Sequence, residues 1–235
     1  PFRMKTCTVL LPTALALSAS ILAQSTPPPP PDGQWKKIQL TEHFWAEGAC
    51  AGDVDKDGDT DILSGPYWYA GPDFKKSQVI YPDVRKSKIK IEGAEKEIPG
   101  FAGALSARNE YSDNFISYTH DFNADGWLDY LVIGFPGKQT TWYENPKGKD
   151  EPWEAHVVFD VTDNESPMFV DITGDKKPEL LCMSGGHLGY AEPDWTKAGE
   201  KWKWHPISPK GGYQRFTHGI GYGDVNGDGR TDILE

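Results

Sequence analysis

The chain has 235 residues, with 24 Lys plus Arg against 35 Asp plus Glu and a net charge of −11. This acidic balance argues against a nucleic-acid-binding protein, because no excess of basic residues is present to neutralise phosphates. Aromatic residues make up 12% of the chain, which argues against disorder. The 25 Gly and 19 Pro, together with those aromatics, favour short strands and tight turns. We therefore expect an all-β fold.

The N-terminal region has the features of a secretory signal peptide. Met4, the expected start, is followed by Lys5 and by an apolar, uncharged run over residues 9–23. A membrane anchor is disfavoured, because the run contains Pro12 and a span needs about 20 apolar residues. We expect residues 1–23 to be a signal peptide, no transmembrane span, and a secreted, periplasmic or cell-surface protein.

A proline-rich segment follows at residues 24–33. Its five consecutive prolines favour the polyproline II conformation, which makes a stiff spacer. The folded domain is then expected over residues 34–235.

One acidic loop occurs four times along the folded part. The loops begin at Asp53, Asp121, Asp171 and Asp224, so their starts are separated by 68, 50 and 53 residues. Each loop is followed by a short β-rich run: DILSG, DYLVIG, ELLCMSG and DILE. An aromatic strand at 141–146 and Trp-led strands at 153–158 and 202–207 complete the unit. Four strands per unit of about 50 residues is the size of a propeller blade.

Residues 35–40 match the Trp-led strand but precede the first loop. In a ring of blades, such an N-terminal strand would complete the last blade and remove its exposed edge. We therefore expect a strand there.

The loop composition predicts a Ca²⁺ site. Oxygen ligands at positions one, three and five alternate with side chains that point away, and position nine adds a carboxylate. Gly at position six permits a sharp turn, and position seven offers its backbone carbonyl. Hard oxygen donors suit Ca²⁺ better than Zn²⁺ or Mg²⁺. The predicted ligands are Asp53, Asp55, Asp57, Asp59, Asp61, Asp121, Asn123, Asp125, Trp127, Asp129, Asp224, Asn226, Asp228, Arg230 and Asp232, of which Asp59, Trp127 and Arg230 act through the backbone carbonyl.

An EF-hand shares the first half of this pattern, but it needs a Glu at position twelve and flanking helices. Position twelve is Ser64 in the first loop and Val132 in the second, and only the fourth loop has Glu235. The flanking segments are strand-like. The pattern therefore argues against EF-hands.

These loops, the Trp-Tyr-Glu-Asn-Pro turn at 142–146 and the blade-sized period resemble the FG-GAP (VCBS-type) repeats of integrin-like β-propellers. The resemblance covers residues 34–235. It implies a propeller, often seven-bladed, with Ca²⁺ in the loops that join the first two strands of a blade. About four blades of four strands fit this length, so we expect the propeller to be incomplete at its C-terminus.

The third loop departs from the pattern. Lys176 replaces the turn Gly, and Lys177 adds a nearby positive charge. We expect a weak or empty site formed by Asp171, Thr173, Asp175 and Glu179.

Few residues outside the loops point to chemistry. Cys50 and Cys182 are expected to be buried thiols rather than a disulfide. His156 and His205 occupy equivalent places in two repeats, which indicates a framework role. Counting six residues back from each loop gives positions near one mouth of the expected channel: Glu47, Phe115, Glu165 and His218. The three ionisable ones are the candidate catalytic residues, although polar strand ends at that mouth are expected in any case.

The first spacing is longer than the others because of a charged segment at 75–112. Long insertions in repeat proteins usually form loops on one face, often the binding face. We expect a surface hairpin that helps to form a partner site.

These features favour a secreted, Ca²⁺-stabilised scaffold that binds extracellular carbohydrate or protein. The alternative is a propeller-type sugar lyase or dehydratase that uses the acids and imidazole at the channel mouth.

Overall fold

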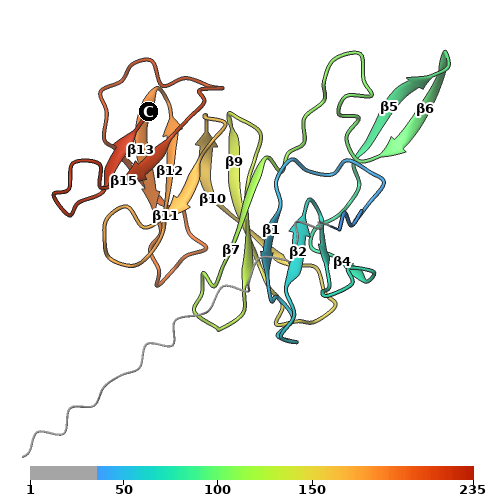
Figure 1. Ribbon diagram of the computed structural model, residues 1–235, viewed down its shortest axis with the longest axis horizontal. Helices are drawn as coiled ribbons and strands as arrows, with labels where there is room; N and C mark the ends of the chain where they lie inside the picture. The colour runs from blue at the N-terminus through green and yellow to red at the C-terminus, as the bar shows by residue number, and fades with distance from the viewer. Residues whose placement is uncertain (1–35) are drawn as a thin grey trace, which may run out of the picture. The chain divides into compact units, whose positions relative to one another are not determined.

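The computed structural model describes residues 36–235, so the expected signal peptide (1–23) and proline spacer (24–33) lie outside the described residues. The described part is all-β, with no helix, and residues 39–235 form one compact unit (Figure 1). The described residues therefore contain no helix that could cross a membrane.

The strands form three four-stranded antiparallel sheets, each a meander whose strands pair in chain order (Figure 1). The first sheet consists of β1 (Cys50–Gly52), β2 (Asp61–Ser64), β3 (Tyr67–Tyr69) and β4 (Ser77–Val79). The second consists of β7 (Ile116–His120), β8 (Asp129–Ile133), β9 (Lys138–Glu144) and β10 (Glu154–Thr162). The third consists of β11 (Met168–Val170), β12 (Glu179–Ser184), β13 (His187–Glu192) and β14 (Lys203–Pro206). The pair β15 (Gly221–Gly223) and β16 (Asp232–Leu234) follows the third sheet.

The second strand of each sheet carries the core. All five residues of β8 are buried, and their side chains alternate between the two faces of the sheet. Tyr130 and Val132 pack against the first sheet, and Leu131 and Ile133 pack against the third. A continuous apolar run is expected for a strand buried on both faces. The sequence DYLVI therefore places β8 between two neighbouring sheets.

The same alternation recurs one sheet further along the chain. Leu180 and Cys182 of β12 pack toward the second sheet. Leu181 and Met183 pack on the other face, where they meet Tyr213, Ile220 and Ile233 around the β15–β16 pair. The core is thus a series of apolar layers, each shared by two consecutive sheets, as in the blades of a β-propeller.

Most of the predicted strands are confirmed. The four β-rich runs that follow the acidic loops are β2, β8, β12 and β16. The aromatic strand is β9, and the two Trp-led strands are β10 and β14, with buried Trp153 and Trp202 just before them.

The strand predicted at 35–40 is wrong for the described residues 36–40, which have no regular structure. A strand forms only where its backbone groups pair with a neighbour, and in the described chain no backbone hydrogen bond joins residues 36–40 to a strand.

The predicted hairpin is confirmed, but the insertion is shorter than expected. β5 (Lys86–Ile91) and β6 (Ala94–Pro99) pair antiparallel outside the blade sheets (Figure 1). Ser77–Val79, which lies within the insertion expected at 75–112, is the fourth strand of the first sheet. The next residue, Ile80, is fully buried and its N–H donates to the Pro66 carbonyl at 2.8 Å. The insertion therefore begins after Ile80.

The meander separates two ends of each sheet. The acidic loops join the first and second strands, and the connection between the third and fourth strands lies at the same end. The turn between the second and third strands, and the link to the next sheet, lie at the opposite end. We call these the loop end and the link end.

The buried alternation of β8 gives a direct test of the core. Leu131→Ala should lower the free energy of unfolding by about 2–5 kcal/mol, because it removes fully buried methyl groups and leaves a cavity. Leu105→Ala, at a side chain that is 65% exposed, is the matched control and should change it by less than about 0.5 kcal/mol. Urea unfolding measures both, and equal effects would contradict the layered core.

Candidate functional site

The four acidic loops, residues 53–61, 121–129, 171–179 and 224–232, share one hydrogen-bonded backbone. In each, the carboxylate at position one accepts a hydrogen bond from the N–H at position six. The four N–O distances, in chain order, are 3.1, 2.8, 2.8 and 2.9 Å, with Gly58, Gly126, Lys176 and Gly229 as donors. The carboxylate at position five accepts from the N–H at position seven in all four, at 2.8–2.9 Å. Hydrogen bonds from backbone N–H groups to carboxylates of the same loop therefore hold each loop in shape.

Two residues of each loop have left-handed backbone. Position four has φ of 61° in Lys56 and 57° in Ala124, and position six has φ of 93° and 86° in Gly58 and Gly126. This backbone suits Gly and disfavours other residues. The third loop exchanges the two, with Gly174 at position four (φ 83°) and Lys176 at position six (φ 70°). The third loop therefore differs from the others in the residues at these positions, but its backbone turn is the same.

The carboxylate at position nine ties the loop to its own sheet. Asp61, Asp129, Glu179 and Asp232 each accept from the N–H at position two, at 2.9–3.0 Å. Asp61 also accepts from Gly71 N at 2.9 Å, and Asp129 from Asn145 N at 2.8 Å. An ionised carboxylate has about four acceptor sites, so both oxygens retain capacity for a metal ion.

The first loop has the strongest geometry for a cation. Ligand atoms of Asp53, Asp55 and Asp57 lie within 4.8 Å of one another. One oxygen of Asp53 is buried and has no hydrogen-bond partner. A buried carboxylate oxygen without a partner is costly unless an ion or water satisfies it. The residues present therefore fit a hard divalent cation.

The second loop is partly compensated by protein groups. The ammonium of Lys147 lies 3.4 Å from Asp125 Oδ2. The amide of Asn123 donates to Asp125 at 3.2 Å and to Glu144 at 3.0 Å. A cation in this loop would compete with these contacts for the same oxygens.

The third loop brings its acids together despite the altered sequence. Ligand atoms of Asp171, Asp175 and Glu179 lie within 4.8 Å of one another, and the Thr173 hydroxyl donates to Glu179 at 3.3 Å. In the described chain, neither Lys176 nor Lys177 makes an ion pair with these acids. That this site is weak or empty stays a prediction.

The fourth loop is the most exposed. Residues 224–232 are exposed except for the half-buried Asp232. Asp228 N donates to Asn226 at 2.9 Å, and the Asn226 amide lies 3.4 Å from Asp228 Oδ2.

Several loop carboxyls have shifted pKa values. Burial, and after it the charge of Asp61, raises the pKa of Asp55. Burial raises the pKa of Asp129 to about 7, against the hydrogen bonds from Asn145 and Phe122 that lower it. The Gly229 N–H lowers the pKa of Asp224. Burial and crowding thus oppose ionisation in the first two loops, and a bound cation would favour it.

Asn145 joins the first two loops. Its side-chain amide donates to the carbonyls of Val54 and Leu128 at 2.8 and 2.9 Å, and its own N–H donates to Asp129. Val54 belongs to the first loop and Leu128 to the second, so one buried side chain connects two sheets. Lys56 of the first loop also lies over the Trp127 ring of the second, 4.3 Å from its centroid.

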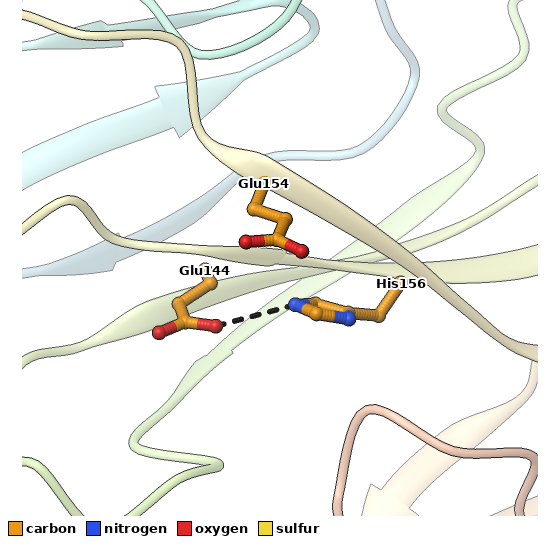
Figure 2. A group of neighbouring side chains, drawn as sticks. All are labelled: Glu144, Glu154 and His156. Atoms are coloured by element: carbon orange, nitrogen blue, oxygen red, sulfur yellow. Dashed lines mark hydrogen bonds and ion pairs between the residues drawn. The ribbon is translucent and has the colours of Figure 1, made fainter.

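A cluster of Glu144, Glu154 and His156 lies where β9 pairs with β10 (Figure 2). His156 Nε2 is 3.2 Å from Glu144, and the imidazole stacks on Trp142 at 4.4 Å. The next sheet repeats the arrangement: His205 Nε2 is 2.6 Å from Glu192, and its ring stacks on Tyr190 at 4.7 Å. An aromatic–His–Glu contact in the same place in two sheets agrees with the predicted framework role.

The candidate catalytic residues do not all come together. All precede the first strand of a sheet, at the link end. His218 Nε2 lies 3.2 Å from the Glu165 carboxylate, with His218 exposed and Glu165 half-buried. Glu47 instead accepts from the Ser112 N–H at 3.1 Å and from the Ser112 hydroxyl. Phe115 packs edge-on against Phe135. The expected group of two acids and one imidazole is therefore not assembled in the described residues.

The cysteines are free, as predicted. Cys182 is buried and Cys50 is half-buried, and burial raises the pKa of the Cys50 thiol to about 12. A thiol that stays protonated at neutral pH is a poor nucleophile, which agrees with a packing role.

Comparison with protein families identifies one repeat. Residues 121–182 match the model of the FG-GAP-like repeat. This stretch runs from the second acidic loop to β12 and includes the third loop, so the chain contains an FG-GAP-like repeat, and such repeats form β-propellers. No curated protein and no solved structure matches the chain.

The bridge formed by Asn145 can be tested by one substitution. Asn145→Ala should lower the free energy of unfolding by more than about 2 kcal/mol, because each buried carbonyl left unpaired costs about 1–3 kcal/mol. Asn109→Ala, at an exposed residue, is the control. Chemical denaturation measures both, and a loss below about 0.5 kcal/mol for Asn145→Ala would show that the two loops are not coupled through it.

Proposed function

We propose that this protein is an exported binding scaffold in which Ca²⁺ in the acidic loops fixes the blades of a β-propeller. The observation that carries the proposal is the convergence of three first-loop carboxylates around a buried, unpartnered Asp53 oxygen. The FG-GAP-like repeat supports a β-propeller scaffold, and the run at residues 9–23 supports export.

Ca²⁺ is the ion that these donors suit best. The side-chain ligands of the complete loops are carboxylates and Asn amide oxygens, and Ca²⁺ takes six to eight such oxygens in flexible geometry. No Cys or His is part of an acidic loop, and His156 and His205 are each paired with a Glu of their own sheet, so the donor set does not suit Zn²⁺. Mg²⁺ keeps several waters and a strict octahedral shell, so it suits a flexible loop of many carboxylates less well.

Ca²⁺ would act on stability through the loop end. The ion would relieve the repulsion between the carboxylates at positions one, three and five. The first loop is bonded through its Val54 carbonyl to Asn145, and Asn145 is bonded to Asp129 of the second loop. Fixing one loop would therefore restrain the neighbouring sheet as well.

The scaffold is proposed to bind extracellular carbohydrate or protein. The link end carries the insertion with its β5–β6 hairpin, which is outside the blade sheets and free to contact a partner. The acidic composition disfavours nucleic acid.

Thermal melting tests the role of Ca²⁺. At about one hundred times its dissociation constant, one bound ion adds about 2.7 kcal/mol. For a domain of this size that corresponds to a rise in Tm of about 5–10 °C over chelator-treated protein. Asp57→Ala should reduce this Ca²⁺-dependent rise in Tm more than Asp175→Ala. Asp57 belongs to the first loop, which has the strongest geometry for a cation, whereas Asp175 belongs to the third loop, which departs from the pattern.

The Ca²⁺-dependent difference in Tm is the readout, since Asp57 also accepts a hydrogen bond from Asp59 N and its loss lowers Tm in both conditions. Asp150→Ala, at an exposed acid outside the loops, is the control. Equal melting of the wild-type chain with Ca²⁺ and with chelator would rule out the structural role of the ion.

A further inference from the structure

A groove of about 1220 Å³ lies at the link end, and none of its lining residues belongs to an acidic loop. One wall is the insertion, with Arg85 and residues 109–113, and the other is the second sheet with the turn at 134–138. Trp45 and Pro66 of the first blade close one side. The insertion and a blade sheet thus form the groove together.

Aromatic rings form much of its surface. Tyr111 is 50% exposed and stacks on Phe135, with ring centroids 5.4 Å apart and planes 30° from parallel. Phe115 and Phe216 meet Phe135 edge-on at 5.8 and 5.6 Å, which fixes its position. Phe135 covers one face of the Tyr111 ring, so the exposed part of Tyr111 is left for a ligand. Tyr111 is therefore a supported aromatic platform at the groove.

Polar groups lie further along the groove. Tyr81 and Tyr143 stack at 4.7 Å, and both line it with Asp113. Burial, followed by the charge of Asp113, raises the pKa of Tyr143 to about 12, so the phenol stays a hydrogen-bond donor at neutral pH. In the described chain, the Asp113 carboxylate makes no hydrogen bond or ion pair with another side chain, and burial raises its pKa. The Asp113 carboxylate, which bonds only its own backbone N–H, and the protonated Tyr143 phenol are thus the polar groups left for a ligand.

The groove is nearly neutral on an acidic protein. Its lining contains Arg85, Lys86 and Lys138 against Asp83, Glu110, Asp113 and Asp160, which leaves a net charge of about −1. Arg85 is paired with Glu110, Lys86 with Glu97 outside the lining, and Asp160 with Lys201. A strongly charged ligand would find little complementary field here.

We propose that this groove binds a neutral oligosaccharide, with Tyr111 stacking on a sugar ring and Asp113 accepting hydrogen bonds from its hydroxyls. A sugar ring presents an apolar C–H face and a rim of hydroxyls, which match an aromatic platform beside unpaired polar groups. The assignment names the ligand class and the site of the proposed scaffold function, and it rests on that function.

An array of neutral and anionic oligosaccharides, probed with the full chain, tests the assignment. We expect binding to one or more neutral glycans. For the best of them, measured by calorimetry, Tyr111→Ala should weaken binding about tenfold, because an aromatic anchor at the centre of a site dominates affinity. Tyr111→Phe keeps the stacking ring and should stay within about twofold of the wild type. Asp113→Asn should weaken binding and leave Tm unchanged.

Tyr222→Ala is the matched control, because Tyr222 is also exposed (43%) but lies on β15, outside the groove. Its glycan affinity should equal that of the wild type. An empty neutral array, binding of anionic glycans alone, or full affinity in a folded Tyr111→Ala variant would each overturn the assignment.

The same samples, melted with Ca²⁺ and with chelator, separate this proposal from the scaffold proposal. A Ca²⁺-dependent Tm with an empty array would overturn the groove and leave the scaffold. Glycan binding that depends on Tyr111 without any effect of Ca²⁺ would support the groove and overturn the structural role of the ion. A protein ligand bound through Tyr111, with no glycan bound, would overturn the carbohydrate assignment.

Discussion

The carboxylate that ends each acidic loop, buried in the first three loops and half-buried in the fourth, is the contact on which the loop end depends. In the second loop, Asp129 is fully buried and accepts the N–H groups of Phe122 and Asn145. Asn145 then donates to the carbonyl of Val54 in the preceding sheet. One carboxylate therefore orders its own loop, fixes the residue after the third strand, and holds the amide that reaches the neighbouring blade. Burial makes these bonds strong and their loss costly.

Packing between sheets follows from the same arrangement. Each second strand begins at a position-nine acid and continues as an apolar run, so its register is set where the loop ends. That register directs Tyr130 and Leu131 to opposite neighbours, and it does the same for Leu180 and Leu181 one sheet later. A shift of one residue would exchange the two faces. The loops are thus part of the packing of the blades as well as candidate ion sites.

The two ends of the blades have different physical tasks. At the loop end, acids crowd together, and burial raises the pKa of Asp55 and Asp129. The crowding and burial of these carboxyl groups favour a cation that compensates their charge. At the link end, connections vary in length without disturbing strand order, and an insertion after Ile80 adds a hairpin and one wall of the groove. A loop end held together by hydrogen bonds, and a link end whose connections vary in length, suit a scaffold that presents a binding surface.

The sequence by itself determined what local chemistry controls. Alternating acids with Gly predicted the four loops, apolar runs predicted the second strands, and the charged segment predicted a hairpin. Tertiary contacts decided the rest. Burial of Ile80 placed the start of the insertion, and residues 36–40 pair with no described strand and are irregular. Glu47 is hydrogen-bonded to Ser112 and does not meet Glu165. Tyr111 stacks on Phe135, which makes it an aromatic platform. These outcomes depend on residues distant in the chain, whose approach no local pattern encodes.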